Sequence, residues 1–196
     1  MSNLPPPVGA PDDEAALLHR YAAGEAAAAR LLAARLTPRA YGHALRVLGD
    51  RAGAEDVAQE AMMRLWRVAP NWRRGEAKVT TWLYRVVANL CTDQLRKRRT
   101  TPLDEADMPA DGAPGAEAQM QQTARVDALQ AALDTLPDRQ RQAVVLRHIE
   151  GLANPEIAAI LEVGVEAVES LTARGKRALK QALEGQRDAL GFSDEG

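Results

Sequence analysis

The sequence predicts an all-α protein built from two small helical domains. Alanine and leucine supply most of its hydrophobic content, which is 46% of the chain with only 4% aromatic residues, and both favour helices. Between Val57 and Val68, apolar residues recur at steps of three and four, as on the buried face of a helix. No run alternates apolar and polar residues convincingly, so strands are not expected.

The expected domains are residues 12–100 and 118–188, joined by a flexible linker over 101–117. Prolines and an acidic run without lysine or arginine characterise that linker. A proline-rich tail over 1–11 is expected to be disordered, and 189–196 form a second tail.

Several classes of protein are not expected. The one cysteine, Cys91, excludes an internal disulfide and suits a reducing compartment. His19, His43 and His148 lie far apart without metal-ligand spacing, so no metal, cofactor or enzymatic activity is predicted. The N-terminus lacks the features of a signal peptide, and no apolar stretch approaches the ~20 residues that span a bilayer. We therefore expect no membrane insertion and a cytoplasmic location.

Four helices are expected in the first domain. The first begins at Asp12 or Asp13 and ends near Gly24, and the second covers 25–48 with a bend or break at Thr37-Pro38. Gly49 and Gly53 bracket a turn. The third helix covers 54–69 and stops before Pro70, and the fourth covers 79–99 after a loop over 70–78.

The second domain is predicted to contain a helix-turn-helix. Two helices come first, over 118–135 and from Pro137 to Gly151. Asn154 as the N-cap and Pro155 at the first helical position begin a short helix, a turn covers 162–164, and a long helix covers 165–183. Such a unit places its second helix in the DNA major groove. An ordinary antiparallel helix pair is the alternative. The small core expected between the two helices is Ile157, Leu161, Val163 and Val168.

The fourth helix has a polar stripe beside two tryptophans. The stripe runs through Thr81, Arg85, Asn89, Asp93 and Arg96 and ends in a block of cations, 96–99. Cations hold phosphates, aromatic rings stack on bases and amides read base edges, a combination that suits unpaired DNA. The alternatives are that the cations complement the helix dipole and that Trp82 belongs to the core.

Three motifs, in order, resemble extracytoplasmic-function sigma factors over about residues 12–185. Region 2.2 of that family is similar to Asp56-Val57-Ala58-Gln59-Glu60-Ala61, continuing to Arg64-Leu65-Trp66. Regions 2.3 and 2.4 are similar to Thr81-Trp82-Leu83-Tyr84-Arg85, Ala88-Asn89 and 93–99. Region 4 is similar to Leu136-Pro137, Arg141, 144–147, Glu150-Gly151-Leu152 and Glu156-Ile157-Ala158. The resemblance implies an alternative sigma factor that directs transcription initiation in a stress response.

The resemblance also implies partners and site residues. The partners are core RNA polymerase, through its β′ clamp helices and β flap, promoter DNA and an anti-sigma factor. The third helix would bind the clamp through Asp56, Gln59, Glu60 and Arg64. The −10 element would be bound by Trp72, Arg74, Thr81, Arg85, Asn89, Arg96, Lys97 and Arg98. The −35 element would be bound by Glu169, Ser170, Arg174, Lys176 and Arg177.

The last helix departs from the family pattern. Glu169 stands where the family commonly has a cation and so reverses a charge, and Leu171 removes one. Since a carboxylate accepts a hydrogen bond from cytosine N4, Glu169 predicts an unusual −35 sequence or a weaker dependence on it; a solvent-facing Glu169 is the alternative. Gly175 inside this helix costs about 1 kcal/mol relative to alanine, and one use for it is close approach of the backbone to DNA.

A second class of function remains open from the residues alone. A regulator could bind duplex operators through the helix-turn-helix without polymerase, with residues 12–100 as a sensor. It would need dimerisation to supply two half-sites. The net charge of −2 argues against a free-standing nucleic-acid binder of any kind, because such proteins usually carry a basic excess.

Overall fold

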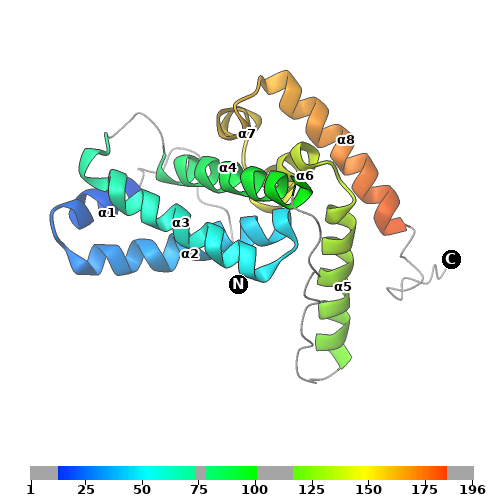
Figure 1. Cartoon of the computed structure of the whole chain (residues 1–196), viewed down its shortest axis with the longest axis horizontal. Coiled ribbons are helices and arrows are strands. Elements are labelled where there is room, and N and C mark those ends of the chain that lie inside the picture. The colour runs from blue at the N-terminus through cyan, green and yellow to red at the C-terminus, as the bar shows by residue number, and fades with distance from the viewer. Residues whose placement is uncertain (1–12, 74–77, 101–116, 185–196) are drawn as a thin grey trace.

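A computed structural model describes residues 13–73, 78–100 and 117–184 of the chain, with side chains from 124 in the last range. These ranges contain eight α-helices and no strand, which confirms the all-α prediction (Figure 1). The predicted tails over 1–11 and 189–196 lie outside the described residues, as does nearly all of the linker over 101–117. No helix in the described ranges combines the length and apolar character that crossing a bilayer requires.

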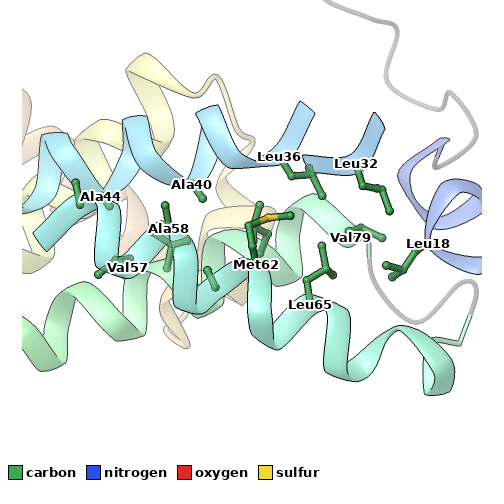
Figure 2. Close-up of a cluster of buried hydrophobic side chains, with 14 of the residues drawn as sticks. Leu18, Leu32, Leu36, Ala40, Ala44, Val57, Ala58, Met62, Leu65 and Val79 are labelled. Carbon is green, nitrogen blue, oxygen red and sulfur yellow. The ribbon is translucent and has the colours of Figure 1, made fainter. Parts of the chain in front are cut away.

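The first helical unit packs four helices around an aliphatic core. They are α1 (Asp13–Ala22), α2 (Ala26–Leu48), α3 (Arg51–Val68) and α4 (Val79–Thr100), with a 3₁₀ turn, η1 (Ala69–Asn71), after α3. Figure 2 shows Leu32 and Leu36 of α2 facing Leu65 of α3, and all three are fully buried. Burying one such side chain contributes about 1.5–3 kcal/mol, so the core fixes how α2, α3 and α4 lie together.

The predicted break at Pro38 is wrong, because α2 continues through it. A proline inside a helix removes one backbone hydrogen bond and costs about 3 kcal/mol. On both sides of Pro38 the same face of α2 is buried, with Leu36 before it and Ala40 after it fully covered. Packing of that continuous face against α3 and α4 outweighs the local cost of the proline.

The turn between α2 and α3 is shorter than predicted. Gly49 ends α2 with φ 68°, in the left-handed region that glycine adopts without strain. The Asp50 side chain accepts hydrogen bonds from Ala52 N at 3.2 Å and Gly53 N at 2.8 Å. This N-cap starts α3 at Arg51, three residues earlier than expected, and places Gly53 inside the helix.

The second helical unit contains α5 (Glu117–Asp134), α6 (Asp138–Val144), a π-helical turn η2 (Val145–Ile149), α7 (Asn154–Leu161) and α8 (Val165–Glu184). Pro137 is the N-cap of α6 and not its first residue. Ala153, not Asn154, is the N-cap of α7, and its N–H donates to Glu156 Oε2 at 3.1 Å. The fold is nevertheless the predicted helix-turn-helix.

Gly175 lies where α8 crosses α6. A Cβ atom added there would meet Val144 Cγ2 at 2.5 Å and the Gln140 carbonyl oxygen at 3.2 Å. The residue is buried, so the close approach that it permits is to α6. The expectation that Gly175 serves backbone approach to DNA is therefore replaced by a packing role.

The two helical units pack on each other, which was not predicted. Tyr84 and Ala88 of α4 share a buried cluster with Leu146, Ile157 and Ile160 of the second unit. Figure 1 shows α7 lying beside α4, and the contacts between these two helices agree. The helix-turn-helix core therefore includes Ile160 and two residues of the first unit, while the expected Leu161 and Val163 are only partly buried.

Candidate nucleic-acid and protein interfaces

The polar stripe of α4 faces solvent because the opposite face of the helix is anchored in the core. Leu83, Val87 and Cys91 are fully buried. Arg85 and Asn89, one turn apart, are exposed, whereas Thr81 is half-buried. The stripe therefore presents a guanidinium and an amide, groups that bind phosphate and base edges respectively.

The cations at the end of α4 already have protein partners. Arg96 pairs with Asp93 at 2.9 Å. Arg98 donates to the Leu48 carbonyl oxygen at 3.2 Å and pairs with Asp50 at 2.6 Å. Arg98 therefore joins the end of α2 to the start of α3, a structural role that the sequence did not reveal. Lys97 is exposed on the same end of the helix.

The two tryptophans beside the stripe pack edge to face, with ring centroids 6.0 Å apart and an interplanar angle of 89°. Trp72 and Trp82 are both partly buried against the first unit's core. Trp82 thus has the core contacts that the alternative interpretation foresaw, and Trp72 shares them. Arg74 lies outside the described residues.

An apolar groove of about 460 Å³ lies between α2 and α3. Of the four residues predicted on α3, Gln59 lines this groove, while Asp56 and Arg64 are exposed elsewhere on the helix. Glu60 pairs with Arg64 at 2.7 Å, and this hydrogen bond lowers the pKa of its carboxyl group. The lining residues are Thr37, Tyr41, Glu55, Ala58, Gln59, Met62, Met63 and Trp66.

Sequence reasoning missed the apolar part of this groove. Met63 leaves 41% of its surface exposed and lines the groove together with the buried Met62. The available signal was the Met62-Met63 pair, because neighbouring residues of a helix point about 100° apart and one narrow buried face does not cover both equally. Nothing in the sequence around Tyr41 indicated that it lines the groove, since it lies on α2 and reaches the groove only when α2 packs on α3.

The recognition helix α8 exposes the predicted residues Glu169, Ser170, Arg174, Lys176 and Arg177. Val168 on its opposite side is fully buried. Arg174 donates to Ser170 Oγ at 2.6 Å, so these two residues act as one donor group. Partial burial, together with Lys176 and Arg147, lowers the pKa of His148, so this imidazole adds no charge at neutral pH.

Cys91 has the properties of a structural thiol. It is fully buried, and burial raises its pKa to about 12, which removes the thiolate that nucleophilic or redox chemistry requires. Within the described residues no three His, Cys, Asp or Glu side chains come together as a metal site.

Comparison with known proteins identifies the family. Residues 32–101 match the Sigma-70 region 2 family model, and residues 127–179 match Sigma-70, region 4. The ECF RNA polymerase sigma factor SigE of Mycolicibacterium smegmatis is 39% identical over 74% of this chain and 57% of its own length. The ECF RNA polymerase sigma factor SigW of Bacillus subtilis is 31% identical over 70% of this chain and 79% of its own length.

Solved structures with a similar fold are also sigma factors. The sigma factor RpoE, solved in complex with the anti-sigma factor NepR from Bartonella quintana, superposes with a TM-score of 0.62 at 20% identity, over 79% of this chain and 96% of that one. The chain belongs to the sigma-70 family. Within it, the chain is a sigma factor of the ECF type, which directs transcription initiation.

Proposed function

We propose that this chain binds core RNA polymerase through the groove between α2 and α3 and the promoter through α4 and α8. One observation carries the proposal: a polar face on α4, an exposed helix α8 and an apolar groove occur in one chain that has no net positive charge. A chain of net charge −2 binds phosphate weakly alone, so a larger enzyme must hold it on DNA. The chain itself supplies recognition and no catalysis, and it works in the cytoplasm beside the polymerase.

The roles on DNA follow from the exposed donors. Asn89 reads a base of the −10 element and Arg85 holds its backbone. The other candidates on α4, together with Trp72 and Arg74, contact the same element. On α8, Arg174, Lys176 and Arg177 contact the −35 element. Glu169, exposed on the same helix, accepts from a cytosine amino group. The two functional domains span residues 12–100 and 118–188.

Protein partners are proposed for the groove and for the second unit. The β′ clamp helices occupy the groove, with Gln59 at its rim and Asp56, Glu60 and Arg64 around it. The second unit contacts the β flap. Because a relative's structure contains an anti-sigma factor, we propose that such a factor covers the polymerase-binding surface of this chain as well.

The first test is transcription with purified core polymerase over a promoter library. Asn89→Ala should impair promoter opening, and Arg174→Ala should weaken use of the −35 element. The matched control is Arg30→Ala, which removes an exposed arginine from α2 and not from α4 or α8. Full activity in both variants would reject these two assignments.

The second test addresses docking. Met63→Glu places a carboxylate in the groove without touching the buried core, and it should weaken association with core polymerase. Leu31→Glu is the matched control, because Leu31 is similarly exposed, 45% against 41%, but lies outside the groove. Equal association of both variants would move the docking surface elsewhere, and no association of the unmodified chain would reject the proposed function.

A further inference from the structure

Met63 is the one exposed sulfur-containing residue among the side chains that the structure describes. It is 41% exposed, whereas its neighbour Met62 is 6% exposed and Cys91 is fully buried. Figure 2 shows the side chain of Met62 between α2 and α3, in the aliphatic core of the first unit. The methionines outside the described side chains are Met1, Met108 and Met120. Within the described part of the chain, an oxidant in solution therefore meets sulfur chiefly at Met63.

Met63 belongs to the apolar groove between α2 and α3. It lines the cavity of about 460 Å³ together with Tyr41, Ala58 and Trp66. Since residues three or four apart are neighbours on a helix, Gln59 and Trp66 border Met63 along α3. An unbranched, polarisable thioether adapts readily to the surface of a partner. A protein that docks in this groove therefore covers Met63 and gains from its burial.

The thioether of a methionine takes up one oxygen atom from a peroxide. A lone pair of the sulfur attacks an oxygen of hydrogen peroxide, the O–O bond breaks and an S–O bond forms. The proton of the transferred oxygen passes to the departing hydroxide, so the products are methionine sulfoxide and one water molecule. Sulfur is oxidised by two electrons and the peroxide is reduced by two. Because no protein group takes part, access to the sulfur decides which methionine reacts.

Oxidation of Met63 changes the groove without changing the core. The sulfoxide is polar, and it replaces an apolar side chain at the centre of a surface that otherwise offers mainly aromatic and aliphatic contacts. Losing most of the apolar burial of one methionine corresponds to about tenfold weaker association. The buried neighbour Met62, which holds α3 against α2, keeps its thioether.

We infer that Met63 is an oxidant-sensitive site, and that its conversion to the sulfoxide blocks docking of core polymerase in the groove. The inference rests on the proposed function, because this groove is the proposed polymerase-binding surface. The same geometry makes oxidation and docking mutually exclusive: bound polymerase covers the thioether, so the free chain is oxidised and the bound chain is spared. Methionine sulfoxide reductases reverse the modification, which makes it a switch.

The first measurement maps oxidation on the full-length chain. The purified chain is treated with hydrogen peroxide, the excess is destroyed with catalase, and the chain is digested with trypsin. Cleavage after Arg51 and Arg64 releases a peptide, 52–64, that carries both neighbouring methionines. Fragmentation of this peptide in a mass spectrometer distinguishes them, and Met63 should be oxidised severalfold faster than Met62. Equal or slower oxidation of Met63 would overturn the inference.

The second measurement is association of the treated chain with untreated core polymerase, each variant being compared with its own untreated form. The oxidised parent should bind about tenfold more weakly. Met63→Leu keeps an apolar side chain but has no thioether, so peroxide should not change its affinity. Met62→Leu is the matched control, because it removes the buried methionine and keeps the exposed one, and it should be as sensitive as the parent. Equal sensitivity of the two variants would refute a switch at Met63.

Two controls separate a changed groove from a damaged fold. Circular dichroism should show the same helix content before and after oxidation, and a loss of helix in step with the loss of association would count against the inference. Met63→Gln introduces a polar side chain of similar length. Without any peroxide it should bind polymerase about as weakly as the oxidised parent, and binding equal to that of the untreated parent would contradict the proposed effect of polarity.

Treatment of the assembled complex tests mutual exclusion. Met63 should gain severalfold less sulfoxide in the complex with core polymerase than in the free chain, and equal oxidation in both would overturn the inference. Association of the untreated parent is measured separately. Its absence would reject the proposed function, whereas normal association that oxidation leaves unchanged would reject the switch at Met63 alone.

Discussion

Replacing Gly175 by alanine tests the crossing of α6 and α8. The added Cβ would lie 2.5 Å from Val144 Cγ2, about 1 Å inside ordinary contact. Val144 is 1% exposed, and the second neighbour, at 3.2 Å, is the Gln140 backbone oxygen, so neither retreats easily. Overpacking of this kind costs up to about 3 kcal/mol. Alanine returns about 1 kcal/mol of helix propensity, which leaves about 2 kcal/mol of net destabilisation.

Thermal and urea unfolding provide the measurement. A loss of about 2 kcal/mol corresponds to a fall in Tm of about 4–8 °C in a chain of this size. The control is Gly42→Ala inside α2, where the added Cβ meets only the flexible end of Arg46, at 3.1 Å. The control should be neutral or more stable by up to about 1 kcal/mol. Gly175→Ala at or above the stability of the parent would refute the tight crossing and return Gly175 to a role on DNA.

Two further predictions concern the first unit. Asp50→Ala should lower the free energy of unfolding by about 1–2 kcal/mol in urea titrations, because α3 loses its N-cap and Arg98 its partner. Asp50→Asn keeps a capping oxygen and should recover most of the loss; equal losses would assign the effect to the ion pair. His43 is fully buried, and burial, with Arg46 nearby, lowers its pKa from 6.5 to about 3. Below pH 6.5 the unfolded state binds a proton at His43 and the folded state does not. The contribution of neutral His43 to the free energy of unfolding is therefore complete above pH 6.5 and is lost as the pH falls towards 3, with about 2 kcal/mol lost by pH 5. Thermal unfolding of His43→Leu should lack that component, and an unchanged pH dependence would contradict it.

The sequence predicted those features that depend on the residues of a single helix. On α4, Arg85 and Asn89 of the predicted polar stripe are exposed, while Leu83 and Val87 on the opposite face are buried. The Asn154-Pro155 start and the turn over 162–164 likewise predicted the bounds of α7 and α8 to within a residue or two. At Pro38 the local rule failed, because burial of α2 on both sides overrode the cost of the proline.

Features made by two distant segments could not be predicted. Tyr84 and Glu150 are ordinary residues of their own motifs, and only the folded chain brings them within a hydrogen bond. The same holds for Tyr41 and Met63, which line one groove from different helices. Periodicity within a helix shows that a face is buried but not which partner buries it.

Arg98 complicates any mutational dissection of the basic block. It is one of the cations predicted to meet promoter phosphates, but its guanidinium also fastens the end of α2 to the start of α3. A transcription defect on its removal would therefore have two possible origins, a missing DNA contact or a loosened scaffold. Neighbouring Arg96 pairs with Asp93 on its own helix and joins no second helix among the described residues, so its removal gives a cleaner readout of promoter contact.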